Sequence, residues 1–315
     1  MRIGQNPAKF VKNVGRPQRI TAAVLSYIPF LSGFYAEALD VLRACMDSMR
    51  ADAGLPFDTM IFDNGSCREV REFLVAEEQA GRIQYLVLSE HNIGKGGAWN
   101  LMFGGAPGEI IAYCDSDVLF SPNWLKRSVE LLETFPNVGM VTARPFRTPP
   151  EFYEATLEWG RKEAEVEVGS FLPWETFLEF NLSLGQSEEE NRKVYSETQD
   201  WRMAYKGVTA FVGGSHWQFT SWKGTLQRFL PFEMDKPMGE VRELDRRVND
   251  AGLLRLMLPD PLVMNLSNTL GYLRGELGRG RQPQRRSVGR LVLNFGPVRR
   301  ALLGIYNRIF RWYYA

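Results

Sequence analysis

Residues 110–120 constrain this chain more than any other stretch. An apolar run, 110–114, is followed at once by two carboxylates, Asp115 and Asp117. Such a run is typical of a strand buried on both faces of a parallel sheet, and open α/β sheets place ligands at the carboxyl ends of their strands. Two hard oxygen ligands favour Mg²⁺ or Mn²⁺ shared with a phosphate. The alternative is a turn that caps the helix expected to begin near Ser121.

The rest of the first half alternates between strand and helix patterns. Apolar runs and apolar spacing predict strands over 20–26, 59–62, 83–88, 110–114 and 138–142, and helices over 35–51, 68–80 and 151–168. A glycine-rich loop at 91–97 should lead into a further helix. This alternation predicts a doubly wound α/β layer. It would bring four polar clusters to one edge of the sheet: Ser26 with Tyr27, Asp63, residues 92–97, and Asp115 with Asp117.

The loop at 91–97 is suited to a phosphate, because glycines 94, 96 and 97 let backbone amides approach an anion beside Lys95 and a helix start. It lacks the Gly-Lys-Ser/Thr ending of a Walker loop. A flexible turn is the alternative interpretation.

Five blocks in order resemble glycosyltransferase family 2: residues 24–27, 63–66, 92–100, 108–117 and 122–125. The resemblance is close over 20–145 and looser to about 270. It implies the GT-A fold, a Rossmann-like mixed α/β sheet with helices on both faces. It also implies an inverting enzyme that uses a nucleotide diphosphate sugar and a divalent metal.

The same resemblance assigns site residues. Those beside the nucleotide or the donor sugar would be Ser26, Tyr27, Asp63, Asn92, Gly94, Lys95, Asp115, Gly213 and Gly214. Asp117 would bind the metal directly, with Asp115 between ribose and metal. His216 and Trp217 would face the acceptor. For each of these residues the alternative is a structural role, such as a turn, a cap or core packing.

The chain departs from the family at two positions. Counting back from Gly252 places the family's Glu–Asp pair on Glu240 and Val241, so Glu240 is the predicted general base and Glu243 the second candidate. A carboxylate here could instead complement a helix N-terminus. Many relatives have a metal-binding histidine after the strand near residue 260, where this chain has Asn265 and Asn268.

Composition is that of an ordinary globular protein, with 44% hydrophobic and 24% charged residues. Three cysteines without metal-ligand spacing fit a reducing cytoplasm. We find no signal-peptide pattern near the start and no apolar stretch of transmembrane length. We expect a basic extension, 1–19, a catalytic domain, 20–271, with a nucleotide-binding half, 20–145, and an acceptor half, 146–271, and a tail, 272–315.

The tail has ten arginines and one acid, Glu276, so the residues before it carry a net negative charge. Residues 288–315 have the pattern of a basic amphipathic helix interrupted at 296–297. We expect this tail to lie on the inner face of an anionic membrane or to pair two copies of the chain. Nucleic acid is the less favoured partner.

Together these features predict a cytoplasmic, metal-dependent hexosyltransferase that moves a sugar from UDP-glucose or UDP-galactose to a hydroxyl acceptor, with Mn²⁺ or Mg²⁺ as cofactor. Two alternatives remain. A nucleotidyltransferase shares the acidic metal site but releases pyrophosphate. A non-catalytic protein that binds sugar nucleotides or membranes would explain Val241 and the missing histidine.

Overall fold

The computed structural model describes residues 4–233, 242–276 and 308. Residues 1–275 form one compact unit and 276–315 a second, most of which lies outside the described residues. Residues 4–19 are exposed, with a 3₁₀ turn at Pro7–Phe10, and the first strand begins at Ile20. The predicted amphipathic tail helix therefore remains a prediction, as do the predicted domain boundaries. Among the described residues, no helix is both long and apolar enough to cross a bilayer.

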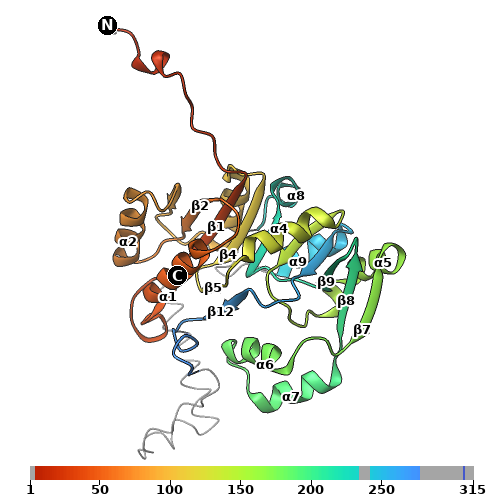
Figure 1. Cartoon of the computed structure of the whole chain (residues 1–315). Helices are drawn as coiled ribbons and strands as arrows, with labels where there is room; N and C mark the ends of the chain where they lie inside the picture. Colours follow the sequence, from red (N-terminus) through yellow and green to blue (C-terminus); the bar gives the residue numbers. More distant parts are fainter. Residues whose placement is uncertain (1–3, 234–241, 277–307, 309–315) are drawn as a thin grey trace, which may run out of the picture. The chain divides into compact units, whose positions relative to one another are not determined.

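A mixed sheet organises the first unit (Figure 1). Its described strands lie in the order β3 (Tyr85–Leu88), β2 (Asp58–Asp63), β1 (Ile20–Ser26), β4 (Ile110–Asp115), β10 (Gln218–Trp222), β6 (Val138–Thr142), β11 (Leu254–Met257), β9 (Val208–Val212), β8 (Asp200–Tyr205) and β7 (Glu165–Gly169). The strands from β3 to β4 are parallel, whereas β10 runs antiparallel to both β4 and β6. The carboxyl ends of β2, β1 and β4 therefore meet the amino end of β10 at one edge.

A small second sheet pairs β5 (Val118–Phe120) with β12 (Val263–Asn265) in antiparallel register. β5 follows directly from the carboxylates at the end of β4. The pairing therefore brings a segment from late in the chain beside that edge.

Helices cover both faces of the sheet. Successive residues of β1 point to opposite faces, so Ala22 and Val24 belong to one core cluster while Ala23 and Leu25 belong to another. The first cluster includes buried residues of α1 (Ala38–Ala51), α2 (Arg68–Gln79) and α4 (Trp124–Thr134). The second includes residues of α3 (Gly94–Gly105), α8 (Lys223–Gln227) and α9 (Arg242–Asp250). The predicted mixed α/β sheet with helices on both faces is confirmed.

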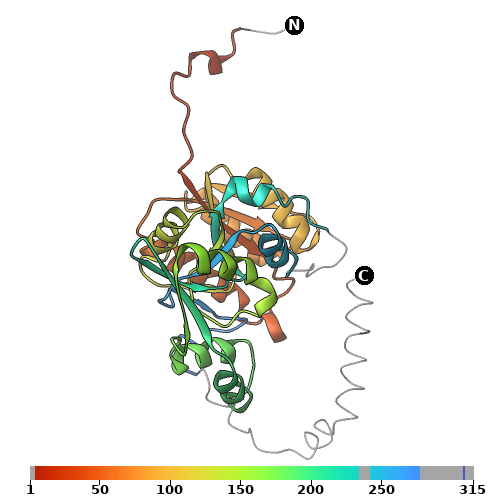
Figure 2. The same ribbon diagram turned by 90° about the vertical axis from the view of Figure 1, so that its right-hand side faces the viewer.

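The helix predicted over 151–168 is wrong in its second half. A 3₁₀ turn at Pro150–Phe152 leads into α5 (Glu154–Glu163), and the chain then forms β7, which pairs with β8. Glutamate and valine alternate along β7, a strand period that the pairing with β8 selects over the helix period. Below β7 and β8 in Figures 1 and 2 lie α6 (Trp174–Ser183) and α7 (Glu188–Glu197).

The loop expected at 91–97 ends earlier than predicted, because α3 already begins at Gly94. Gly96 lies within its first turn, and a Cβ there would come within 2.3 Å of the Glu233 carbonyl oxygen. Gly96 therefore also serves close packing between α3 and the segment before residue 234. The helix predicted over 35–51 begins at Ala38, after a 3₁₀ turn at Gly33–Tyr35.

Candidate functional site

The ends of three neighbouring strands bring the predicted nucleotide residues together. In the strand registers Ser26 lies opposite Asp63, and Leu25 lies opposite Asp115. Ser26 and Asp63 are fully buried, and Tyr27 follows at the end of β1 with a partly exposed side chain. Parallel strands end at a common edge, so the carboxylates predicted from separate loops form one rim, which we call the carboxylate rim: Ser26, Asp63, Asp115 and Asp117.

Three atoms of the carboxylate rim are buried without a hydrogen-bond partner among the described residues. They are Ser26 Oγ, Asp63 Oδ1 and Asp117 Oδ1. An unpaired buried polar atom costs about 1–3 kcal/mol, and native structures hold few of them. Three at one rim indicate a place where a polar ligand completes the hydrogen bonding.

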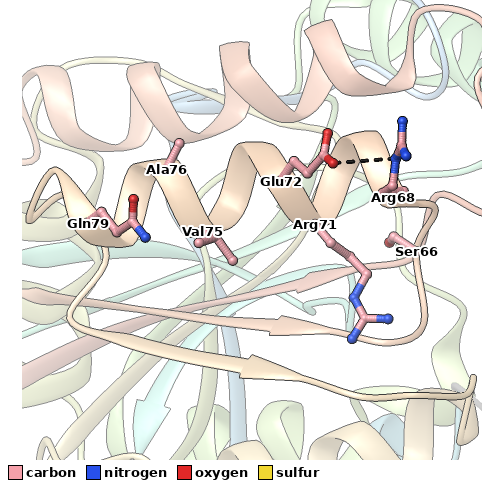
Figure 3. Close-up of a pocket in the computed structure, with 7 residues that line it drawn as sticks. All are labelled: Ser66, Arg68, Arg71, Glu72, Val75, Ala76 and Gln79. Atoms are coloured by element: carbon pink, nitrogen blue, oxygen red, sulfur yellow. Dashed lines mark ion pairs between the residues drawn. The ribbon is translucent and has the colours of Figure 1, made fainter.

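Only one of the two carboxylate oxygens of Asp63 has a hydrogen-bond partner among the described residues. Its Oδ2 accepts a hydrogen bond from the Ser66 amide at 3.1 Å, while burial raises the pKa of the carboxyl against the opposing effects of Ser66 and the Arg71 charge. Figure 3 shows Arg71 extending from α2 toward the strands, away from the ion pair of Arg68 with Glu72. The hollow of about 510 Å³ that these residues line runs along α2, outside the carboxylate rim.

Asn64 ties the loop after β2 to the start of α3. Its amide donates to Asn92 Oδ1 at 3.0 Å, and its Oδ1 accepts from the Ile93 amide at 2.9 Å. Asn92 Oδ1 also accepts from the Gly94 amide at 2.8 Å. Gly65, at φ +85°, leaves a Cβ position only 2.9 Å from the Asn92 nitrogen. The predicted residues Asn92 and Gly94 are thus part of a rigid joint between two loops of the rim.

Lys95 holds Asp115. Its Nζ lies 2.7 Å and 2.8 Å from the two carboxylate oxygens, and Tyr113 donates its hydroxyl to Oδ1 at 2.6 Å. The ammonium also lies over the faces of the Trp99 and Tyr113 rings. Burial and Asp115 raise the pKa of Tyr113 well above its ordinary value, so this phenol stays a donor. Sequence reasoning placed Lys95 beside a phosphate and missed its ion pair with Asp115.

Asp117 has an unpaired carboxylate oxygen, whereas both carboxylate oxygens of Asp115 accept hydrogen bonds. Burial, with a smaller contribution from Asp115, raises the pKa of Asp117 to about 7, against the lowering effect of Lys95. A divalent cation would stabilise the ionised form, so the residue fits a metal ligand on this observation. The backbone oxygen of Asp117 accepts from the Leu266 amide at 2.7 Å, which anchors the turn.

Asn265 and Asn268, which stand where many relatives have a metal-binding histidine, have different surroundings. Asn265 pairs with Val118 across β12 and β5, beside Asp117, and its Oδ1 accepts from Ser267. Asn268 instead donates to the Phe34 carbonyl oxygen at 2.6 Å. Within residues 4–233 and 242–276, no three His, Cys, Asp or Glu side chains gather as a metal site. A cation here would take its remaining ligands from water and phosphate.

Gly213 and Gly214 have backbone donors that are already bonded. The Gly213 amide donates to the Arg255 carbonyl oxygen at 2.9 Å and the Gly214 amide to Thr148 Oγ1 at 3.2 Å. At Gly213, with φ +131°, a Cβ would come within 2.3 Å of the same Thr148 oxygen. These glycines serve a close approach of chain segments, and their predicted contact with the donor sugar stays a prediction.

His216 and Trp217 lie beside the carboxylate rim at the amino end of β10. The Asp115 amide donates to the Trp217 carbonyl oxygen at 2.9 Å. The Trp217 ring is buried and stacks on Phe180 within a core cluster, and its predicted contact with the acceptor stays a prediction. His216 Nδ1 lies 2.6 Å from Asp245 Oδ2. Sequence reasoning missed Asp245; its only signal was an acid between Leu244 and Val248 on the buried face of α9.

Of the two predicted general bases, Glu240 and Glu243, the structure describes only Glu243. Glu240 and Val241 lie outside the described residues. Glu243 is in the first turn of α9 and forms an ion pair with Arg247 four residues on. Its carboxylate is therefore engaged within its own helix.

A family model and a known protein, both of glycosyltransferases, match parts of this chain. Residues 33–188 match the family model described as glycosyl transferase family 2. An uncharacterized glycosyltransferase of Nostoc sp. is 29% identical over 100 residues, which are 32% of this chain and 31% of that protein.

Two solved structures are among those similar to this chain. A mannosyltransferase of Pyrobaculum calidifontis in complex with GDP-Man and Mn²⁺ has 17% identity and a TM-score of 0.48 over 84% of this chain and 61% of its own. The S. aureus protein TarS (residues 1–349) in complex with UDP has 12% identity and a TM-score of 0.44 over 78% and 59%. The chain thus spans less than two thirds of each of these relatives.

Proposed function

Because this chain belongs to glycosyltransferase family 2 through residues 33–188, we propose that it transfers a hexose from a nucleotide diphosphate sugar to a hydroxyl acceptor with inversion. UDP-glucose or UDP-galactose is the proposed donor. The observation that carries this proposal is the set of three unpartnered polar atoms on the carboxylate rim. A sugar nucleotide supplies hydroxyl and N–H donors for carboxylate oxygens and acceptor oxygens for the Ser26 hydroxyl.

The nucleoside would bind at the ends of β1 and β2. Asp63 Oδ1 is an unpaired acceptor there, and Ser26 Oγ can both donate and accept. A uracil N–H or a ribose hydroxyl would donate to Asp63. Tyr27, which follows Ser26, and Asn92, which Asn64 holds, would also lie beside the nucleoside.

The diphosphate would lie toward the end of β4. Asp117, with Asp115, would hold Mn²⁺ or Mg²⁺, whose positive charge stabilises the charge that develops on the leaving phosphate oxygen. Lys95 adds a cation at the same point, since its ammonium lies against Asp115. The predicted general base, Glu240, remains a prediction because it lies outside the described residues.

The test compares UDP binding and donor hydrolysis in the wild type and Asp117→Ala. Calorimetric titration of UDP with and without Mn²⁺ should show metal-dependent affinity in the wild type, reduced about tenfold or more in Asp117→Ala. Acceptor-free hydrolysis of UDP-glucose or UDP-galactose should fall at least as far.

A matched control is Asp58→Ala, which removes a carboxylate at the opposite end of β2, where Asp58 accepts from the Gln18 amide. It should bind UDP as the wild type does. Release of pyrophosphate instead of UDP would indicate a nucleotidyltransferase. UDP binding without turnover of either donor would favour a non-catalytic binding protein.

A further inference from the structure

His216 lies beside the carboxylate rim, although it follows Asp115 by about a hundred residues in the sequence. β10 runs antiparallel to β4, with Gln218 opposite Cys114, so the residues before Gln218 lie beyond the carboxyl end of β4. The hydrogen bond from the Asp115 amide to Trp217 fixes that placement. His216 thus lies one residue from the backbone contact that joins β10 to Asp115.

A buried chain of charged groups orients the imidazole. His216 Nδ1 lies 2.6 Å from Asp245 Oδ2, and Asp245 Oδ1 accepts from Arg255 Nη2 at 2.5 Å. Arg255 is itself fully buried and donates further to the carbonyl oxygens of Phe152 and Gly214, both at 2.6 Å. We call His216, Asp245 and Arg255 the relay. Because Asp245 holds His216 and Arg255 holds Asp245, the imidazole cannot turn without breaking a buried contact.

The same relay sets the tautomer. Asp245 also forms an ion pair with Arg255. An ionised carboxylate only accepts hydrogen bonds, and Nδ1 must therefore carry the proton. The lone pair is left on Nε2. A carboxylate that fixes the tautomer of a histidine in this way is the arrangement used to prepare a general base.

Nε2 remains available. The His216 side chain is 19% exposed, and no hydrogen bond joins its Nε2 to any group in residues 4–233 or 242–276. Glu243, on the same helix as Asp245, is engaged by Arg247, whose guanidinium also donates to the Phe229 carbonyl oxygen. Among the described residues at this rim, Asp115 is held by Lys95. The unpaired oxygens of Asp63 and Asp117 are buried. Among these described groups, His216 therefore offers the base that is both oriented and accessible.

We infer that His216 Nε2, in place of the predicted Glu240, is the general base of the proposed transfer, with Asp245 and Arg255 as positioning residues; this inference rests on the proposed function. As the acceptor oxygen bonds to C1 of the sugar, the C1–O bond to the diphosphate breaks and its electron pair stays on the phosphate oxygen. The acceptor proton moves to Nε2. The resulting imidazolium is stabilised by Asp245 and later returns the proton to water.

The experiment uses the full chain, with UDP-glucose and UDP-galactose as probes and water as the acceptor. His216→Gln keeps a side chain able to donate to Asp245 but cannot take up a proton, and His216→Ala leaves a space for free imidazole. In both variants hydrolysis should fall about 10²-fold or more, while the Kd for UDP changes less than about threefold. Added imidazole should raise the rate of His216→Ala with a saturable concentration dependence, and should leave His216→Gln unchanged.

The matched control is Asp58→Ala, which removes a carboxylate at the opposite end of β2 from the carboxylate rim. Its hydrolysis rate should stay close to that of the wild type, with or without imidazole. Wild-type rates in His216→Gln would overturn the assignment of the base and leave the proposed transfer intact. A loss in His216→Ala that imidazole does not restore would also overturn it, in favour of a structural histidine. A wild type that hydrolyses neither donor would overturn both proposals.

Discussion

Asp117 is a carboxyl group whose surroundings favour its neutral form. Burial and the neighbouring Asp115 raise its pKa to about 7, from an ordinary value of 3.8. In the unfolded chain the group ionises near the ordinary value, so the folded state resists ionisation between the two values. Stability at this site is therefore fully present below the unfolded pKa and is lost as the pH rises through about 7.

Replacing Asp117 by asparagine should thus stabilise the metal-free protein at high pH only. We expect a gain of about 2–4 kcal/mol at about pH 8, because each pKa unit corresponds to roughly 1.4 kcal/mol, and almost none at about pH 4. Urea unfolding of both proteins in a chelating buffer measures this difference. An equal gain at both pH values would show that packing, and not ionisation, is responsible.

At the scale of elements, the rim depends on how closely two loops approach. Asn64 links them by hydrogen bonds, and the absent side chain of Gly65 lets the backbone at His91 and Asn92 come within contact distance. Both the positive φ and the lack of space demand glycine at this position.

Gly65→Ala should therefore destabilise the protein more than the same change at an open glycine. Gly81 offers the control, since its φ is +74° but no atom lies within 4 Å of its Cβ position. We expect about 1–2 kcal/mol for Gly81→Ala from strain alone, and roughly 1–3 kcal/mol more for Gly65→Ala from overpacking. UDP affinity should fall only in Gly65→Ala. Equal losses in thermal unfolding and unchanged UDP binding in both variants would contradict this view of the joint.

At the scale of the whole molecule, net charge differs in sign between residues 1–271 and the tail. The residues before the tail are net acidic and the tail holds ten arginines with one acid. Basic residues near an anionic bilayer contribute about 1 kcal/mol each. The proposed association with the inner membrane face rests on this tail.

The full chain should co-sediment with vesicles that contain phosphatidylserine and not with neutral vesicles. Replacing Arg299, Arg300, Arg308 and Arg311 together by glutamine should reduce the bound fraction about tenfold or more while leaving UDP affinity unchanged. Added salt should release the wild type. Binding that survives the four changes would count against the membrane proposal. Loss of a dimer in the same variant, seen by light scattering, would favour the alternative of tail pairing.

Local sequence patterns were sufficient to predict which strand ends form much of the candidate site. Ser26, Asp63 and Asp115 each follow a short apolar run, and the strands that these runs form end at one edge because the sheet is parallel there. The same logic failed at 165–169, where a strand pattern lay inside a helix prediction and only β8 decided between them. The predicted loop over 91–97 was also too long, because α3 begins at Gly94.

The sequence by itself determined which side chains stand at the carboxyl ends of the first strands, since strand period and chain order are local properties. Only the tertiary structure decided their partners. Lys95 reaches Asp115 across 20 residues, and the relay from His216 through Asp245 to Arg255 joins a strand end, a helix and a further strand. Such pairs form because a buried charge must find an opposite one, and where that partner lies depends on how the layers pack.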